Sequence, residues 1–309
     1  MLLVRSGRSQ VNEKANEVLI MTKRKKIKSA ELVSEWSDIF RCPHCGTKMQ
    51  VEAWKSLTCV HHHTFDFTKQ GYLNLMKQPI KSNYDKTLFE ARQHVVGETE
   101  LFQLLHQRIS EILSRLNKET ITILDVGCGE GSHLHQIMEG RLDRSLVGIG
   151  LDIAKEGILQ AAKNYIDPIW VVGNLANAPF QKNVFDVVIN ILSPSNYVEF
   201  KRLVASNGLI IKVVPRNNYL SELREVLMKS EKREMNNKDE VVSLFQDHFE
   251  TTKRIPLTYR HKLNQTVLHD LVRMTPLAWS ADPKRIQSFT EQESAEITID
   301  LDILIGRNN

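Results

Sequence analysis

The sequence lacks the features that mark membrane and exported proteins. No apolar run in its 309 residues approaches the roughly 20 residues that a membrane-spanning helix needs. The N-terminus has no hydrophobic stretch of the kind found in secretory signals. The net charge is only +4, which is weaker than the usual charge of a nucleic-acid-binding protein. These absences predict a cytoplasmic protein that does not contact a membrane.

Cysteine is also scarce. Of the four cysteines, three fall within residues 42–59 and Cys128 stands alone. Clustering of this kind, in a chain without an export signal, favours metal ligands in a reducing compartment over disulfide bonds. We expect Cys128 to be a small buried side chain.

The length of the chain predicts one large domain and a small one. The stretch MTKRKKIK, with five basic residues in eight, favours a solvated tail over an RNA-contacting arm, and its Met21 is a second candidate start. We expect four segments: a basic, flexible extension over residues 1–34, a zinc-binding domain over 35–80, a connecting helical region over 81–118, and an α/β domain over 119–309.

Apolar runs alternate with helical periodicity from residue 121 onward. The predicted strands are ITILDVG, LVGIGLDI, IWVVGN, FDVVINIL and GLIIKVVP. Continuous apolar strands separated by helices indicate a parallel sheet that is covered on both faces. TTKRIPLTYRHKL and AEITIDLDILIG alternate in hydrophobicity, as an antiparallel pair does. The result is a Rossmann-like, mostly parallel seven-stranded sheet, which is the layout of a class I methyltransferase.

A glycine turn follows the first of these strands. DVGCGEG, residues 125–131, places the acid Asp125 before Gly127 and Gly129, where bare backbone can meet a ligand. Asp152 ends the second strand, where a carboxylate can accept both ribose hydroxyls of an adenosine, and Asn174 ends the third, at the edge of the adenine. Together these positions resemble an S-adenosylmethionine site.

The cysteine cluster predicts a structural zinc site. Cys42 and Cys45 form a CxxC knuckle, and Cys59 lies far enough along the chain for a hairpin to return it to the same ion. The histidines that follow supply a fourth ligand, but spacing alone does not choose between His62 and His63. A zinc site of this size replaces a core that so short a segment cannot build.

The order of motifs resembles a known family. FRCPHC, TCVHHHTFDFTKQGYLNL, FEARQ, LDVGCGEG, GLDIAK, NILSP and MTPLAW occur in sequence over roughly residues 38–305. This combination is similar to the bacterial 23S rRNA (guanine-N1)-methyltransferases, in which a zinc domain precedes a class I methyltransferase domain. The resemblance implies methylation of guanine N1 in a hairpin loop of 23S rRNA, rRNA recognition by the zinc domain, a homodimer and, in some members, resistance to macrolides such as tylosin.

The resemblance also implies particular residues. The histidine that stands before an aromatic residue and an aspartate falls on His63, so that the zinc ligands are Cys42, Cys45, Cys59 and His63. The cofactor positions are Gly129, Glu130, Phe102 and Tyr219. The family can carry tyrosine at the position of Phe102 and histidine at that of Tyr219. At both positions this chain keeps an aromatic ring, but the hydrogen-bonding group at the end of the side chain differs.

Guanine N1 carries a proton at neutral pH that must leave before or during methyl transfer. The segment NILSP ends the fourth strand and places Asn190 and Ser193 as candidates to hydrogen-bond the guanine edge, although neither is a good base. Two other classes compete with this interpretation: a small-molecule methyltransferase with a stabilising zinc knuckle, and a non-catalytic RNA-binding protein. The intact glycine turn and Asp152 argue against the second class.

Overall fold

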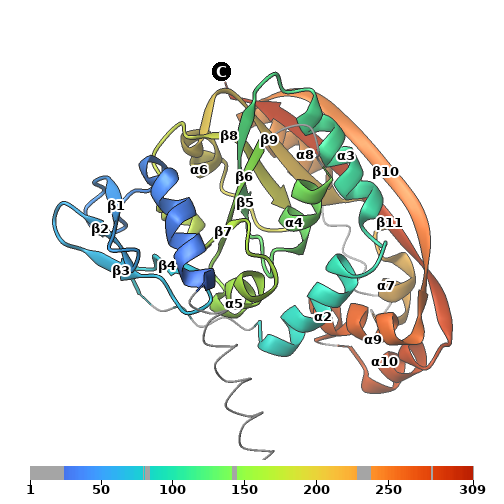
Figure 1. The fold of residues 1–309 in the computed structure, drawn as a ribbon. Helices are drawn as coiled ribbons and strands as arrows, with labels where there is room; N and C mark the ends of the chain where they lie inside the picture. Colours follow the sequence, from blue (N-terminus) through green and yellow to red (C-terminus); the bar gives the residue numbers. More distant parts are fainter. Residues whose placement is uncertain are drawn as a thin grey trace, which may run out of the picture.

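The structure is a computed structural model that describes residues 24–78, 80, 84–140, 145–227, 238–279 and 281–308. Its centre is an eight-stranded sheet with the strand order β10-β11-β9-β8-β5-β6-β7-β4 (Figure 1). The strands of this sheet are β4 (Leu73–Asn74), β5 (Thr120–Val126), β6 (Ser145–Asp152), β7 (Ile169–Val172), β8 (Phe185–Ile191), β9 (Val204–Pro215), β10 (Glu250–Asn264) and β11 (Ser294–Arg307).

Helices cover both faces of the sheet. They are α2 (Lys86–Gly97), α3 (Gln103–Ser114), α4 (Ser132–Glu139), α5 (Lys155–Asn164), α6 (Tyr197–Leu203), α7 (Ser221–Leu227), α8 (Lys238–His248), α9 (Gln265–Met274) and α10 (Pro283–Thr290), with 3-10 turns η1 (Ser37–Ile39), η2 (Leu175–Asn177) and η4 (Pro276–Ala278). None of the helices in the described ranges is both long and apolar enough to cross a membrane.

All seven predicted strands are present, and an eighth joins them. Strands β4, β7, β6, β5, β8 and β9 run parallel, and β11 and β10 complete the sheet as the predicted antiparallel pair. The eighth strand, β4, comes from the cysteine-bearing segment and pairs Leu73 with Val171 and Asn74 with Val172. A two-residue strand has no periodicity of its own, so the sequence did not predict it.

The sheet separates two hydrophobic cores. Alternate side chains of β5 point to opposite faces, so that Ile123 belongs to one core and Leu124 to the other. The first core is closed mainly by α2 to α5, α7 and α9, and the second by α6, α8 and the cysteine-bearing segment. This burial on both faces explains why the strands are continuously apolar.

The connecting helical region predicted over residues 81–118 consists of two helices, α2 and α3. Helix α2 begins after Asp85, whose side chain accepts a 2.8 Å hydrogen bond from the Leu88 amide. It ends at Gly97, and the polar residues after it form bends until α3 begins at Gln103. Thr99 Oγ1 closes the last turn by donating to the Val95 carbonyl at 2.6 Å.

The predicted flexible extension over residues 1–34 is wrong in its second part. Residues 24–35 form a helix, in which Ala30 and Val33 are fully buried in the second core. Lys28 pairs with Asp167 of the α/β domain at 2.7 Å. These apolar contacts outweigh the local charge that suggested a solvated tail. Residues 1–23, including Met21, lie outside the described residues.

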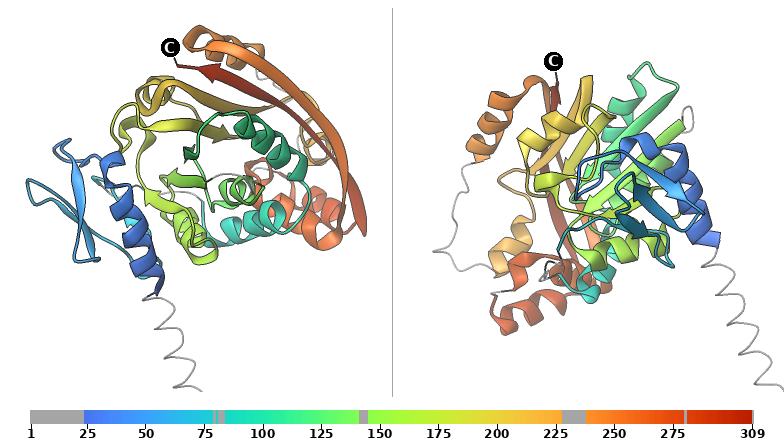
Figure 2. Two further views of the ribbon diagram at one scale, coloured as in Figure 1. Left: turned by 45° about the horizontal axis from the view of Figure 1, so that its top comes forward. Right: turned by 90° about the vertical axis from the view of Figure 1, so that its left-hand side faces the viewer.

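A small antiparallel sheet follows Cys42 and Cys45 and contains Cys59: β1 (Met49–Glu52), β2 (Ser56–Cys59) and β3 (Thr64–Asp66). This zinc ribbon projects from the edge of the molecule that lies away from β10 (Figure 2). Its base is attached to the loop after η2: the Arg41 amide donates to the Pro179 carbonyl at 3.0 Å, and the Gln181 amide donates to the Ile39 carbonyl at 2.7 Å. The ribbon therefore shares backbone hydrogen bonds and a core with the large sheet.

Candidate functional site

The glycine turn joins β5 to α4 along a backbone path that favours glycine. Gly127, Gly129 and Gly131 have φ angles of +75°, +59° and +82°, a region that costs other residues roughly 1 kcal/mol each. A Cβ on Gly127 would lie 2.0 Å from Ser193 Oγ, and one on Gly131 would lie 2.3 Å from the Trp170 ring. Glycine therefore lets the turn pack directly against β7 and the segment after β8.

Asp152 lies at the end of β6, directly beside the turn. Its Oδ2 accepts a 2.8 Å hydrogen bond from the Gly129 amide, and its Oδ1 accepts one of 2.7 Å from the Ala154 amide. Each carboxylate oxygen keeps a second lone pair that can accept a ribose hydroxyl. Asn174 was predicted to end the third strand, but it lies two residues after β7 and caps η2, where its side chain accepts a 2.9 Å hydrogen bond from the Ala176 amide.

Three acids and one arginine meet around the turn. Burial raises the pKa of Asp125 to about 7, with Asp152 and Glu130 adding to the effect and Arg92 opposing it. Burial also raises the pKa values of Glu130 and Asp152. Arg92 Nε lies 2.7 Å from Glu130 Oε2, and the Glu130 side chain is fully buried.

The sequence analysis assigned no role to Arg92. A signal was present in the motif FEARQ, because Phe89 and Arg92 are three residues apart and lie on one face of α2. The side chains of both residues approach Gly129. We call the group of Asp125, Glu130, Asp152 and Arg92 the acid cluster.

The two aromatic candidates occupy different places. Tyr219 is half-buried near Arg92, and burial raises the pKa of its hydroxyl to about 12. Phe102 is only 1% exposed and presents its ring edge-on to His133, with centroids 5.2 Å apart. The structure therefore brings Tyr219 to the acid cluster, whereas Phe102 packs against a buried histidine.

The acid cluster fits a cofactor that carries an amino group and hydroxyls. The carboxylate of Glu130 is buried with Arg92 Nε 2.7 Å from its Oε2, and its remaining lone pairs can accept a hydrogen bond from a ligand amino group. Gly127 and Gly129 offer bare backbone beside it, and Asp152 offers acceptors. These features match the amino-acid and ribose portions of S-adenosylmethionine.

The candidate residues after β8 are close to the turn, but Asn190 is fully engaged. Its Nδ2 donates to the Val126 carbonyl at 2.9 Å and to the Pro194 carbonyl at 3.2 Å, and its Oδ1 accepts from Lys212 Nζ at 2.7 Å. Asn190 thus holds the residues after β8 in place, and its amide is not free to hydrogen-bond a guanine. Ser193 is half-buried and packs against the glycine turn.

Lys212 is a buried cation that the sequence did not reveal as part of the site. It lies on β9 directly opposite Asn190 and is 4% exposed. Its ammonium group also contacts Ser195 Oγ and the Ser193 carbonyl. Burial lowers the pKa of Lys212 to about 8. Lys212 therefore stabilises residues 190–195 through hydrogen bonds to neutral acceptors.

The structure brings four zinc-ligand atoms together: those of Cys42, Cys45, Cys59 and His63, all within 4.8 Å of one another. His63 Nδ1 lies 3.4 Å from Cys59 Sγ and 3.6 Å from Cys42 Sγ, and Cys45 Sγ lies 3.6 Å from Cys59 Sγ. Tetrahedral zinc with Zn–S bonds of about 2.3 Å places its ligand atoms roughly 3.5 to 3.8 Å apart. His62 is exposed in the left-handed turn before His63, with a φ of +62°.

The chemistry of the donor set also fits zinc. Hydrogen bonds from the side chain and backbone of Thr47 lower the pKa of Cys45 to about 5, which favours the thiolate that binds metal. All four cysteines are free, so no disulfide competes for the site. Cys128 is 2% exposed, as predicted for a packing residue.

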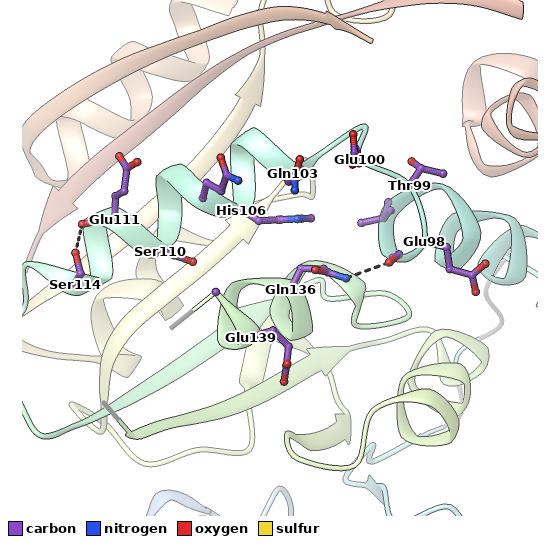
Figure 3. A pocket seen from close by; sticks show the side chains of 14 residues that line it. Glu98, Thr99, Glu100, Gln103, His106, Ser110, Glu111, Ser114, Gln136 and Glu139 are labelled. Carbon is purple, nitrogen blue, oxygen red and sulfur yellow. Dashed lines mark hydrogen bonds between the residues drawn. The ribbon is translucent and has the colours of Figure 1, made fainter. Parts of the chain in front are cut away.

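A separate cleft opens between the end of α2, α3 and α4 (Figure 3). Its lining is polar and acidic, with Glu98, Glu111 and Glu139 among its side chains, and it includes neither the glycine turn nor Asp152. His106 at its wall places Nε2 2.8 Å from Nδ1 of the buried His133. The histidine pair links the wall of the cleft to α4, the helix that follows the glycine turn.

A Rossmann-like sheet with this glycine turn and acid cluster, joined to a Cys₃His ribbon, defines a class I S-adenosylmethionine-dependent methyltransferase with a structural zinc site. Residues 117–272 match the family described as a methyltransferase domain, and residues 40–83 match the zinc ribbon described as RlmA, N-terminal. The chain belongs to the 23S rRNA (guanine-N1)-methyltransferase family, as its relatives show.

YxjB of Bacillus subtilis (strain 168), provisionally named a 23S rRNA (guanine-N1)-methyltransferase, is 43% identical over 87% of this chain and 96% of its own. The 23S rRNA (guanine(748)-N1)-methyltransferase of Streptomyces fradiae is 26% identical over 80% of this chain and 88% of its own. Among solved structures, an N-methyltransferase of Haemonchus contortus aligns with a TM-score of 0.46 and 11% identity over 74% of this chain and 58% of that chain.

Proposed function

We propose that this enzyme transfers a methyl group from S-adenosylmethionine to N1 of a guanine in a hairpin loop of 23S rRNA. The observation that carries the proposal is the combination, in one chain, of the acid cluster at the glycine turn and the Cys₃His ribbon, with 43% identity to YxjB along nearly the whole length. A small-molecule methyltransferase has no evident use for a ribbon that is built into the edge of its sheet.

The cofactor supplies an already activated methyl group, so the protein's main task is alignment. In this proposal Asp152 holds the ribose, and the glycine turn and acid cluster hold the amino-acid portion. Ser193, which packs on the turn, meets the edge of a guanine that has left its stack. Lys212 and Asn190 keep the Ser193 segment in place, and the N1 proton leaves to water.

The ribbon offers a surface for single-stranded RNA. Trp54 lies at the tip of the β1–β2 hairpin in a left-handed turn with a φ of +56°, and 51% of it is exposed. Exposed aromatic rings bind unpaired bases by stacking. His61 and His62 are also exposed, but they lie in the β2–β3 turn at the opposite end of β2, beside the zinc ligands. We propose that the Trp54 end of the ribbon contacts the rRNA hairpin.

The test is transfer of labelled methyl from S-adenosylmethionine to 23S rRNA that lacks its native methylation, followed by mapping of the modified nucleotide. Label at N1 of a single loop guanine is expected. Label on small metabolites but never on rRNA would overturn the proposal. Trp54→Ala should raise the KM for rRNA and leave cofactor affinity unchanged, whereas Asp152→Ala should weaken cofactor binding.

Three further expectations belong to the same proposal. The protein forms a homodimer, which light scattering of the zinc-loaded protein would measure. Its compartment is the cytoplasm, where its rRNA substrate is found. Expression in a sensitive host is expected to raise the concentration of tylosin needed to stop growth. An unchanged inhibitory concentration would show that this enzyme does not confer macrolide resistance.

A further inference from the structure

Arg92 stands out among the charged residues of the site because most of its donors make no hydrogen bond to any residue that the structure describes. Its Nε faces Glu130 Oε2 at 2.7 Å, and Nε itself is buried. A guanidinium group carries five N–H donors in a fixed plane, four of them on its two terminal amino groups. Within the described ranges, those terminal amino groups donate no hydrogen bond to the protein, and the only ion-pair partner of the side chain is Glu130.

The position of Arg92 directs these donors to the cofactor region. A Cβ placed on Gly129 would lie 3.4 Å from Arg92 Nε, so the guanidinium lies against the bare backbone of the glycine turn. The side chain is 22% exposed although Nε is buried, so the exposed part lies elsewhere on it. The ion pair with Glu130 fixes the orientation of the group from one side.

The charges around the turn leave one place for a ligand carboxylate. Asp125 and Glu130 are buried and Asp152 is half-buried, and Arg92 is the cation that opposes the rise in pKa of each. A ligand with positive charge suits the three acids. A carboxylate on the same ligand would meet repulsion everywhere in this cluster except at Arg92.

We infer that the terminal amino groups of Arg92 bind the α-carboxylate of the methionine portion of S-adenosylmethionine, with Glu130 as the positioning residue that orients the guanidinium fork. Parallel N–H donors match a carboxylate in a two-point contact, which lysine does not reproduce. The inference rests on the proposed function only for the identity of the cofactor, because it involves no RNA.

The experiment compares two ligands that differ only in the carboxylate. Titration calorimetry on the zinc-loaded full chain measures the affinity for S-adenosylmethionine and for its decarboxylated form, in the wild type and in Arg92→Gln. We expect Arg92→Gln to weaken the first ligand by about 30-fold and the second by less than about 3-fold, since a charged hydrogen-bonded contact contributes roughly 2 kcal/mol. Arg108→Gln, on the exposed face of α3, is the matched control and should change neither affinity.

Equal weakening of both ligands by Arg92→Gln would overturn the inference, because it would indicate a purely structural role for the Arg92–Glu130 pair. An unchanged preference for the carboxylated ligand would overturn it as well. Arg92→Lys keeps the charge and loses the fork; it should lose part of the preference, and it serves as the test if the glutamine variant does not fold. Failure of rRNA labelling would leave these binding results standing, so the two proposals fail separately.

Discussion

Replacing Asp125 by asparagine is expected to remove a pH-dependent loss of stability. Burial raises the pKa of this carboxyl from 3.8 to about 7 in the folded protein. Between these values the folded state holds a proton that the unfolded state has lost, so the free energy of unfolding falls as the pH rises through this window. Between pH 5 and pH 8 the fall amounts to about 3 kcal/mol, at 1.36 kcal/mol per unit over the two units below the folded pKa.

The assay is urea unfolding of the zinc-loaded, cofactor-free protein at pH 5 and pH 8, for the wild type and for Asp125→Asn. The difference between the two proteins cancels the titration of every group that does not interact with Asp125. The variant should gain about 3 kcal/mol relative to the wild type between the two pH values. Asp38→Asn, at an exposed position, is the control and should show no such gain. The same difference between wild type and Asp125→Asn at both pH values would refute the reasoning.

Three further predictions concern other parts of the site. His63→Ala should lose stoichiometric zinc while His62→Ala keeps it, as measured by metal analysis, and the reverse result would exchange their roles. Gly127→Ala should displace the Ser193 segment, which its Cβ would approach to 2.0 Å, and should weaken S-adenosylmethionine binding by at least 10-fold in calorimetry; wild-type affinity would show that the turn yields easily. Burial lowers the pKa of Lys212 in the folded protein to about 8, so between pH 8 and 10.5 the unfolded protein holds a proton that the folded protein has lost. The free energy of unfolding of the wild type should therefore rise by about 3 kcal/mol over this range, and Lys212→Met should abolish the rise. A rise that persists in urea unfolding of the variant would contradict this prediction.

The strands and the turn could be predicted because their signals are local. Each parallel strand is a run of mostly apolar residues, and the turn has glycine at every second position because its backbone is left-handed there. A few adjacent residues are therefore enough to identify either feature. The four zinc ligands required more than spacing, since only the resemblance to the family separated His63 from His62. The placement of His63 in the ligand cluster agrees with that choice.

The missed features are long-range. The pairing of β4 with β7 joins Leu73 to Val171 across nearly one hundred residues, and no local pattern of two residues encodes it. The engagement of Asn190 depends on Lys212, which lies on another strand and has the appearance of an isolated polar residue in an apolar run. Arg92 becomes visible as part of the site only when α2 is packed over the glycine turn.

Strand β4 also fixes the distance between the ribbon and the glycine turn. Because it extends the large sheet, the root of the ribbon stands three strand spacings from β5, across β7 and β6, which is about 14 Å at the usual spacing of neighbouring strands. That offset is held by backbone hydrogen bonds instead of by a linker. If the ribbon holds the rRNA loop, as proposed above, the guanine reaches the glycine turn only when a matching length of unpaired chain separates it from the bases on the ribbon. Loop size would then contribute to substrate choice.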